Sequence, residues 1–101
     1  MTVTLYSVEV SYLNAGVKVV SVAAEEKPKT YSLHERAGGG FGYRSTINKR
    51  ELLTLGIAFS RAAAIVMFIA ARQRTIERLR AEIDCEAQQI LAAEKLRGEN
   101  A

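Results

Sequence analysis

The amino-acid sequence predicts an α+β fold: an antiparallel β-hairpin or three-stranded sheet, followed by one long C-terminal helix with a coiled-coil seam. Three observations predict this fold class. Apolar and polar residues alternate near the N-terminus, as they do in half-buried strands. No Gly or Pro occurs between Ile57 and Arg97. Within that stretch isoleucine recurs at every seventh position, which is the repeat of a coiled coil.

Two segments are expected to pair as an antiparallel hairpin. In the first, Thr2–Tyr12, one face carries Tyr6, Val8, Val10 and Tyr12, and the other carries Ser7, Glu9 and Ser11. The second, Val17–Ala24, is rich in β-branched residues, and Leu13–Gly16 supplies the turn between them. A shorter segment, Lys29–His34, is the candidate third strand, with Tyr31 and Leu33 facing inward.

The next segment, Glu35–Tyr43, contains four glycines and two aromatic residues. Because glycine carries the largest backbone entropy, this segment is expected to be a flexible loop that exposes Phe41 and Tyr43. The helix is then expected to begin with Asn48 as its N-cap and Glu51 three residues later, a pattern resembling a capping box.

Gly56 is expected either to kink the helix or to separate one short turn from its main body. The following segment, Ile57–Ala71, is apolar nearly all round, which predicts burial on two sides. A single domain of 101 residues is therefore expected. It would comprise a sheet region with its Gly-rich loop at 1–47, a long helix at 48–97 and a frayed tail at 98–101.

The net charge of +3 is unevenly distributed. Residues 1–50 contain seven Lys or Arg against four acidic residues, whereas residues 51–101 contain seven of each. The excess lies between Lys27 and Arg50, where basic and aromatic residues interleave. Such a mixture is typical of surfaces that bind single-stranded nucleic acid or protein. The expected binding residues are Arg36, Phe41, Tyr43, Arg44, Lys49 and Arg50.

Little in the sequence indicates catalysis. His34 and Cys85 are the single His and Cys of the chain, and they fall on different predicted elements. A metal site needs three or four convergent ligands, so neither a metal nor a cofactor is expected. The Gly-rich segment also lacks the Gly-Lys-Ser/Thr sequence of a phosphate-binding loop. We therefore expect a non-enzymatic protein.

The composition also bears on location. A single cysteine fits a reducing cytoplasm, and the first ten residues do not resemble a signal peptide. The segment Leu52–Ala71 is long enough to span a bilayer. However, Arg61 lies in its middle and the segment is rich in alanine, so a soluble helix is favoured over a membrane span.

The predicted function is that of a small binding protein that dimerises and engages another macromolecule. Inhibition of that macromolecule is one possible result of the binding. The short chain, the sheet-plus-helix plan and the missing catalytic groups resemble small accessory proteins of phages and mobile elements. The expected partners are a second copy of the chain and a protein whose identity the sequence does not reveal. The alternative is a nucleic-acid-binding protein that uses residues 27–50, and a membrane-associated protein is the third hypothesis.

The coiled-coil register predicts the dimer seam, which consists of Ala62, Ile65, Ile69, Arg72, Ile76, Leu79, Ile83, Glu86 and Ile90. In a parallel pair, Arg72 would face Arg72 and Glu86 would face Glu86 of the other chain. An antiparallel pair that crosses between Ile76 and Leu79 avoids both contacts. The sequence therefore predicts an antiparallel homodimer that buries about 1,600 Å² or more. Its two Cys85 residues would lie roughly 20 Å apart along the axis, too far to crosslink readily.

Overall fold

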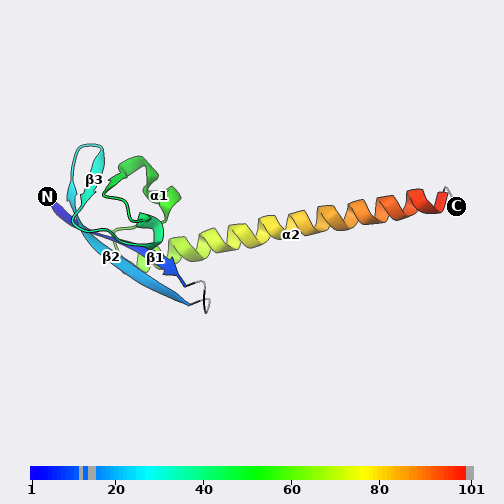
Figure 1. Cartoon of the computed structure of the whole chain (residues 1–101), viewed down its shortest axis with the longest axis horizontal. Coiled ribbons are helices and arrows are strands. Elements are labelled where there is room, and N and C mark those ends of the chain that lie inside the picture. Colours follow the sequence, from blue (N-terminus) through cyan, green and yellow to red (C-terminus); the bar gives the residue numbers. More distant parts are fainter. Residues whose placement is uncertain (12, 14–15, 100–101) are drawn as a thin grey trace. The chain divides into compact units, whose positions relative to one another are not determined.

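The computed structural model describes residues 1–11, 13 and 16–99 of the chain. It confirms the α+β class: a four-stranded antiparallel sheet is followed by one long C-terminal helix, α2 (Figure 1). The strands follow each other in the sheet in chain order and are β1 (Thr2–Val10), β2 (Val17–Glu26), β3 (Thr30–Leu33) and β4 (Thr46–Asn48). The chain divides into two compact units, Met1–Ile69 and Ala70–Ala101.

Four helical segments accompany the sheet in the described part of the chain. Two are single 3-10 turns, η1 (Gly39–Phe41) and η2 (Lys49–Glu51). The short helix α1 (Leu52–Leu55) ends at Gly56, whose φ of 72° is the left-handed conformation of a helix C-cap. The long helix α2 spans Arg61–Glu99. Gly56 therefore separates a short turn from the main helix, which was one of the two predicted outcomes.

The predicted hairpin is present and it is the longest pairing in the sheet. β1 and β2 are antiparallel from Thr2 opposite Glu25 to Val10 opposite Val17. β2 continues to Glu26, two residues beyond the prediction. The turn predicted at 13–16 and the position of Tyr12 fall largely outside the described residues. β4 was not predicted, because its three residues are too few to show a periodic pattern.

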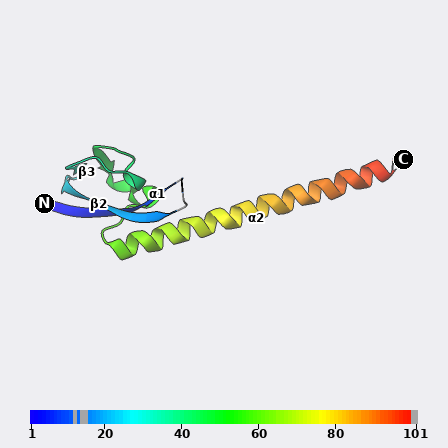
Figure 2. The same cartoon turned by 60° about the horizontal axis from the view of Figure 1, so that its bottom comes forward.

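The core of the first unit lies on one face of the sheet. Its most deeply buried apolar residues include Leu5 of β1, Val22 of β2, Ile47 of β4 and Phe41 of η1. Ser7 shares this face and is 1% exposed, whereas Tyr6 and Val8 on the other face are half-buried. Figure 2 shows why neither face is free: α1 lies on one side of the β1–β2 ribbon, and the first turns of α2 lie on the other.

The Gly-rich segment is not the flexible loop that the sequence predicted. Three of its residues form η1, which packs closely on β1. The Gly40 N–H donates a hydrogen bond of 2.8 Å to the Ser7 hydroxyl. A Cβ atom on Gly40 would lie 2.0 Å from the Leu55 backbone oxygen. Glycine is needed here because two segments of backbone approach each other, and the segment is ordered by that approach.

The helix also starts later than predicted. Asn48 is the last residue of β4 and makes no side-chain capping bond. The long helix begins at Arg61 instead, where the Ser60 hydroxyl accepts a hydrogen bond of 3.1 Å from the Ala63 N–H. This is the geometry of an N-cap. At its other end the helix continues through Glu99, so Gly98 is helical rather than part of a frayed tail.

Burial of the segment Ile57–Ala71 is likewise more limited than predicted. Ile57 and Ala58 are buried, but they precede the helix. Ala58 forms a short β-bridge to Tyr6, with hydrogen bonds of 2.8 and 2.9 Å, and so covers part of the outer edge of β1. Within α2, Ala64 is the one described residue that is fully buried. Most of the burial in this segment therefore occurs in the connection before α2, and less of it occurs within the helix.

Candidate interaction surfaces

The first candidate surface is the predicted seam of α2. Ile65, at the start of α2, is half-buried, but the large apolar members after it are exposed in the single chain: Ile83 is 66% and Ile90 is 59% exposed. Ile69, Ile76 and Leu79 are each close to half exposed. Side chains of this size are usually buried, so a regular row of them along one helix is a candidate interaction surface.

Several polar contacts within α2 lie beside the seam. Arg78 and Glu82 form an ion pair of 3.9 Å, one turn apart on the helix surface. The Thr75 hydroxyl donates to the Ala71 carbonyl at 3.1 Å. Cys85 is exposed, and its sulfur accepts a hydrogen bond from the Gln89 amide at 3.6 Å. These contacts support the helix and leave the isoleucine row accessible.

The second candidate surface is the predicted binding segment, and the structure divides it. Phe41 is 0% exposed and belongs to the core, so its assignment to a binding surface is wrong. Phe41 is the last residue of η1 and the buried residue of that turn. Tyr43, two residues later, is exposed and has a φ of 59°, which is unusual for a residue other than glycine. Its N–H donates to the Ala37 carbonyl at 2.8 Å, which holds this conformation.

The basic members of the predicted set also differ in their surroundings. Arg44 forms an ion pair with Glu51 at 3.2 Å, and Lys49 forms one with Glu26 at 3.4 Å. The Lys49 ammonium also lies 5.2 Å from the centre of the Tyr31 ring. Arg36 and Arg50 are exposed. Two of the four basic residues are thus engaged within the chain, and two face solvent.

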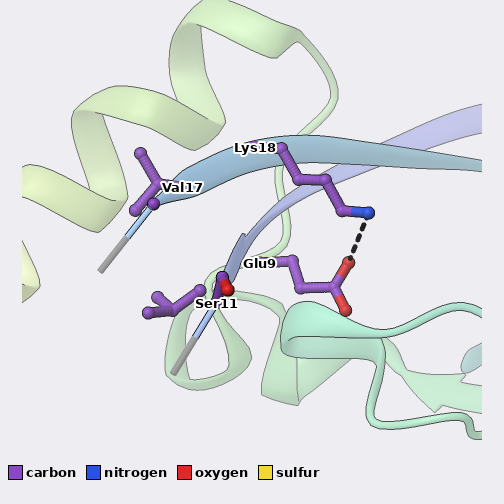
Figure 3. A pocket seen from close by; sticks show the side chains of 6 residues that line it. Glu9, Ser11, Val17 and Lys18 are labelled. Atoms are coloured by element: carbon purple, nitrogen blue, oxygen red, sulfur yellow. Dashed lines mark ion pairs between the residues drawn. The ribbon is translucent and has the colours of Figure 1, made fainter. Parts of the chain in front are cut away.

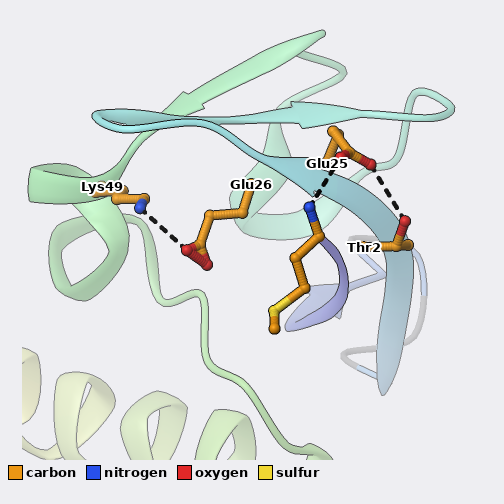
Figure 4. A network of polar contacts seen from close by, with 5 residues as sticks. Thr2, Glu25, Glu26 and Lys49 are labelled. Carbon is orange, nitrogen blue, oxygen red and sulfur yellow. Dashed lines mark hydrogen bonds and ion pairs between the residues drawn. The ribbon is translucent and has the colours of Figure 1, made fainter.

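The fold brings together a basic corner, which we define as Lys27, Lys29, Lys49 and Arg50. The Lys49 N–H donates to the Lys29 carbonyl at 3.0 Å, so the turn between β2 and β3 lies beside η2. Figure 4 shows the Lys49–Glu26 ion pair at this end of the sheet, together with Glu25, which accepts hydrogen bonds from the Met1 amino group and the Thr2 hydroxyl. These bonds lower the pKa of Glu25, the amino group being the main cause and Thr2 the next.

An exposed aromatic ring accompanies the basic corner, and the sequence interpretation missed it. Phe59 was assigned to the helix, but it lies in the connection before α2 and is 59% exposed. Its ring meets the Tyr31 ring edge-on, with 6.1 Å between ring centres. The signal available in the sequence was Gly56, which ends α1 and leaves the following residues outside regular helix.

An open pocket lies at the end of the hairpin. It is lined by Glu9, Val10, Ser11, Gly16, Val17 and Lys18 (Figure 3). Its two charged residues, Glu9 and Lys18, pair with each other at 3.6 Å. The pocket therefore offers a ligand a neutral rim and no convergent reactive groups among its lining residues.

Among the described residues, no group of three or more His, Cys, Asp or Glu is placed to hold a metal ion. Within the same part of the chain, none of the helices combines the length and apolar character that crossing a bilayer requires. Comparison of the chain with models of known families, with curated proteins and with solved structures finds no match.

Proposed function

We propose that this chain is a non-enzymatic binding protein that dimerises through the α2 seam and engages another macromolecule with its first unit. The observation that carries the proposal is the exposed isoleucine row on a helix of 39 residues. A helix of this length measures about 58 Å at 1.5 Å per residue. The accessory-protein role and the cytoplasmic location belong to this same proposal.

The energetics of the seam favour association. Full burial of one Ile or Leu side chain contributes roughly 1.5–3 kcal/mol. Six such residues of each chain lie on the seam from Ile65 to Ile90. Even partial burial of this row in a dimer offsets the loss of translational and rotational freedom, which costs on the order of 4–15 kcal/mol. A helix that stays exposed gains none of this free energy.

Two adjacent residues provide a matched test of dimerisation. Ile90 and Leu91 are both 59% exposed, but Ile90 lies on the seam and Leu91 lies beside it. Ile90→Glu removes an apolar side chain from both copies and should weaken the dimer by about two orders of magnitude or more. Leu91→Glu introduces the same charge and should leave the dimer nearly unchanged. Sedimentation equilibrium measures both dissociation constants, and equal effects of the two substitutions would contradict the proposal.

Engagement of a protein target is proposed for the exposed side chains Arg36, Tyr43 and Arg50. Arg and Tyr are favoured anchors of protein interfaces. A pull-down with the wild-type chain, after nuclease treatment, should retain a partner that the Arg36→Ala/Tyr43→Ala chain does not. Capture that is unchanged by these substitutions, or that disappears with nuclease, would argue against this surface.

A second candidate function, nucleic-acid binding, is favoured by the basic corner and the exposed ring of Phe59. Basic side chains attract phosphates, and exposed rings stack on bases. The Lys27→Gln/Lys29→Gln/Arg50→Gln chain should lose affinity for a labelled single-stranded oligonucleotide. The Arg74→Gln/Arg78→Gln/Lys95→Gln chain loses the same formal charge and should retain it. Fluorescence anisotropy that shows no binding even at low salt would dismiss this function.

A further inference from the structure

We infer that the two α2 helices run antiparallel and cross between Ile76 and Leu79, with Arg72 of each chain paired to Glu86 of the other. This inference rests on the proposed pairing through the seam and identifies its occupant as a second copy of this chain. It is carried by the charge complementarity of the seam and by the exposed apolar residues beside it.

The charges of the seam disfavour a parallel pair. Arg72 and Glu86 occupy equivalent positions two heptads apart, and both are exposed. In a parallel pair each residue would face its own copy, so like charges would meet twice within the seam. Like charges held close together away from water are costly. The antiparallel arrangement replaces both repulsive contacts with attractive ones.

The antiparallel layers follow directly from the sequence numbers. The helices cross between Ile76 and Leu79. Two residues of the two chains therefore lie opposite each other when the sum of their residue numbers equals the sum for Ile76 and Leu79. The resulting pairs are Ile76 with Leu79, Ile65 with Ile90, Ala62 with Ala93, Ile83 with Arg72, and Ile69 with Glu86. Along the axis, two apolar layers are thus followed by two layers in which an isoleucine meets the aliphatic stem of a polar residue, and this order repeats. Arg72 and the Glu86 of the second copy lie in adjacent layers, about 4.5 Å apart along the axis.

A residue beside the seam supports the same orientation. Val66 is 65% exposed and lies next to the seam at the start of α2. In a parallel pair its flanking neighbour in the other chain would be the charged Arg61. In the antiparallel pair that neighbour is Ala87, so the exposed valine meets another apolar residue. The arrangement is also isologous, as a two-fold dimer requires.

A charge-swap series in the full chain tests the pairing. Arg72→Glu should weaken the dimer by about tenfold or more, because it places two carboxylates together, and Glu86→Arg should act similarly. The Arg72→Glu/Glu86→Arg chain should recover most of the wild-type affinity. In a parallel dimer each substitution merely exchanges one like-charge contact for another, so three unchanged dissociation constants in sedimentation equilibrium would overturn the inference.

Distances between spin labels test the orientation independently. In the Cys85→Ser background, labels on Ala63→Cys should lie about 44 Å apart along the axis of an antiparallel dimer, but side by side in a parallel one. Circular dichroism of each variant checks that the helix is intact. Short distances in a dimer would overturn the antiparallel orientation alone. A monomer at all concentrations would overturn both this inference and the proposed dimerisation.

Discussion

The two compact units of the chain use large apolar side chains in opposite ways. In Met1–Ile69, residues such as Leu5, Phe41 and Ile47 are fully buried by their own chain. In Ala70–Ala101, no described residue is buried, and Ile83 is among the most exposed apolar side chains. The difference teaches that the core is built from the first unit alone, whereas the large apolar residues of the second unit stay exposed, as do Phe59 and Val66 of the first.

The largest effect should come from a residue of the first unit that the sequence placed on a binding surface. Phe41→Ala should lower the free energy of unfolding by about 3–5 kcal/mol, because it leaves a cavity in the core. Tyr43→Ala removes an exposed ring two residues away and should change stability little. Urea denaturation measures both. A small loss for Phe41→Ala would show that its ring is not part of the core and would reopen its functional role.

A smaller effect is expected where glycine permits close packing. Gly40→Ala should destabilise the first unit by roughly 1–3 kcal/mol, because its Cβ would clash with backbone of α1 and with Ser7. Gly98→Ala is the matched control, since nothing lies within 4 Å of the added methyl group and the position is helical. It should leave stability unchanged or raise it by a few tenths of a kcal/mol. Loss of stability in both chains alike would contradict the contrast between packed and open glycines.

The sequence predicted the parts of the fold that have a period. The hairpin has alternation and α2 has a heptad repeat, and both elements exist, although α2 begins at Arg61 rather than at residue 48. It failed where contacts between distant segments decide the structure. The order of the Gly-rich segment depends on the approach of Gly40 to Ser7 and Leu55, which no local pattern reveals. Phe41 was misplaced for the same reason.

The start of α2 shows a different kind of failure, because the N-cap was predicted at Asn48 and lies at Ser60. Asn48 with Glu51 resembled a capping box, but its segment pairs with β3. Ser60 caps the helix instead, and Phe59 before it is left exposed. Because Asn and Ser both favour N-caps, local preference did not distinguish them. The pairing of β4, which is a tertiary contact, decided between the two positions.

The choice of cap leads to a further prediction. Ser60→Ala removes the bond to the Ala63 N–H and should destabilise the protein by about 1 kcal/mol. Asn48→Ala removes no side-chain capping bond and should cost less. Thermal unfolding followed by circular dichroism measures both changes. A larger loss at Asn48 than at Ser60 would place the helix start where the sequence suggested.

The smallest effect concerns Glu25, whose pKa lies below its ordinary value of 4.5 because the Met1 amino group and the Thr2 hydroxyl donate hydrogen bonds to the carboxylate. A carboxyl group with a lowered pKa in the folded state contributes stability above its unfolded pKa. That contribution is lost as the pH falls through the folded value. The side chain is more than a third exposed, so solvent weakens the interaction. Glu25→Gln should therefore lower the urea midpoint slightly at neutral pH, and the difference from wild type should shrink as the pH falls below the ordinary pKa of 4.5. Glu35→Gln makes the same change of formal charge at an exposed site and should change the urea midpoint less at neutral pH. A difference between Glu25→Gln and wild type that persists in acid would mean that the amide alters packing, and that the ion pair contributes nothing.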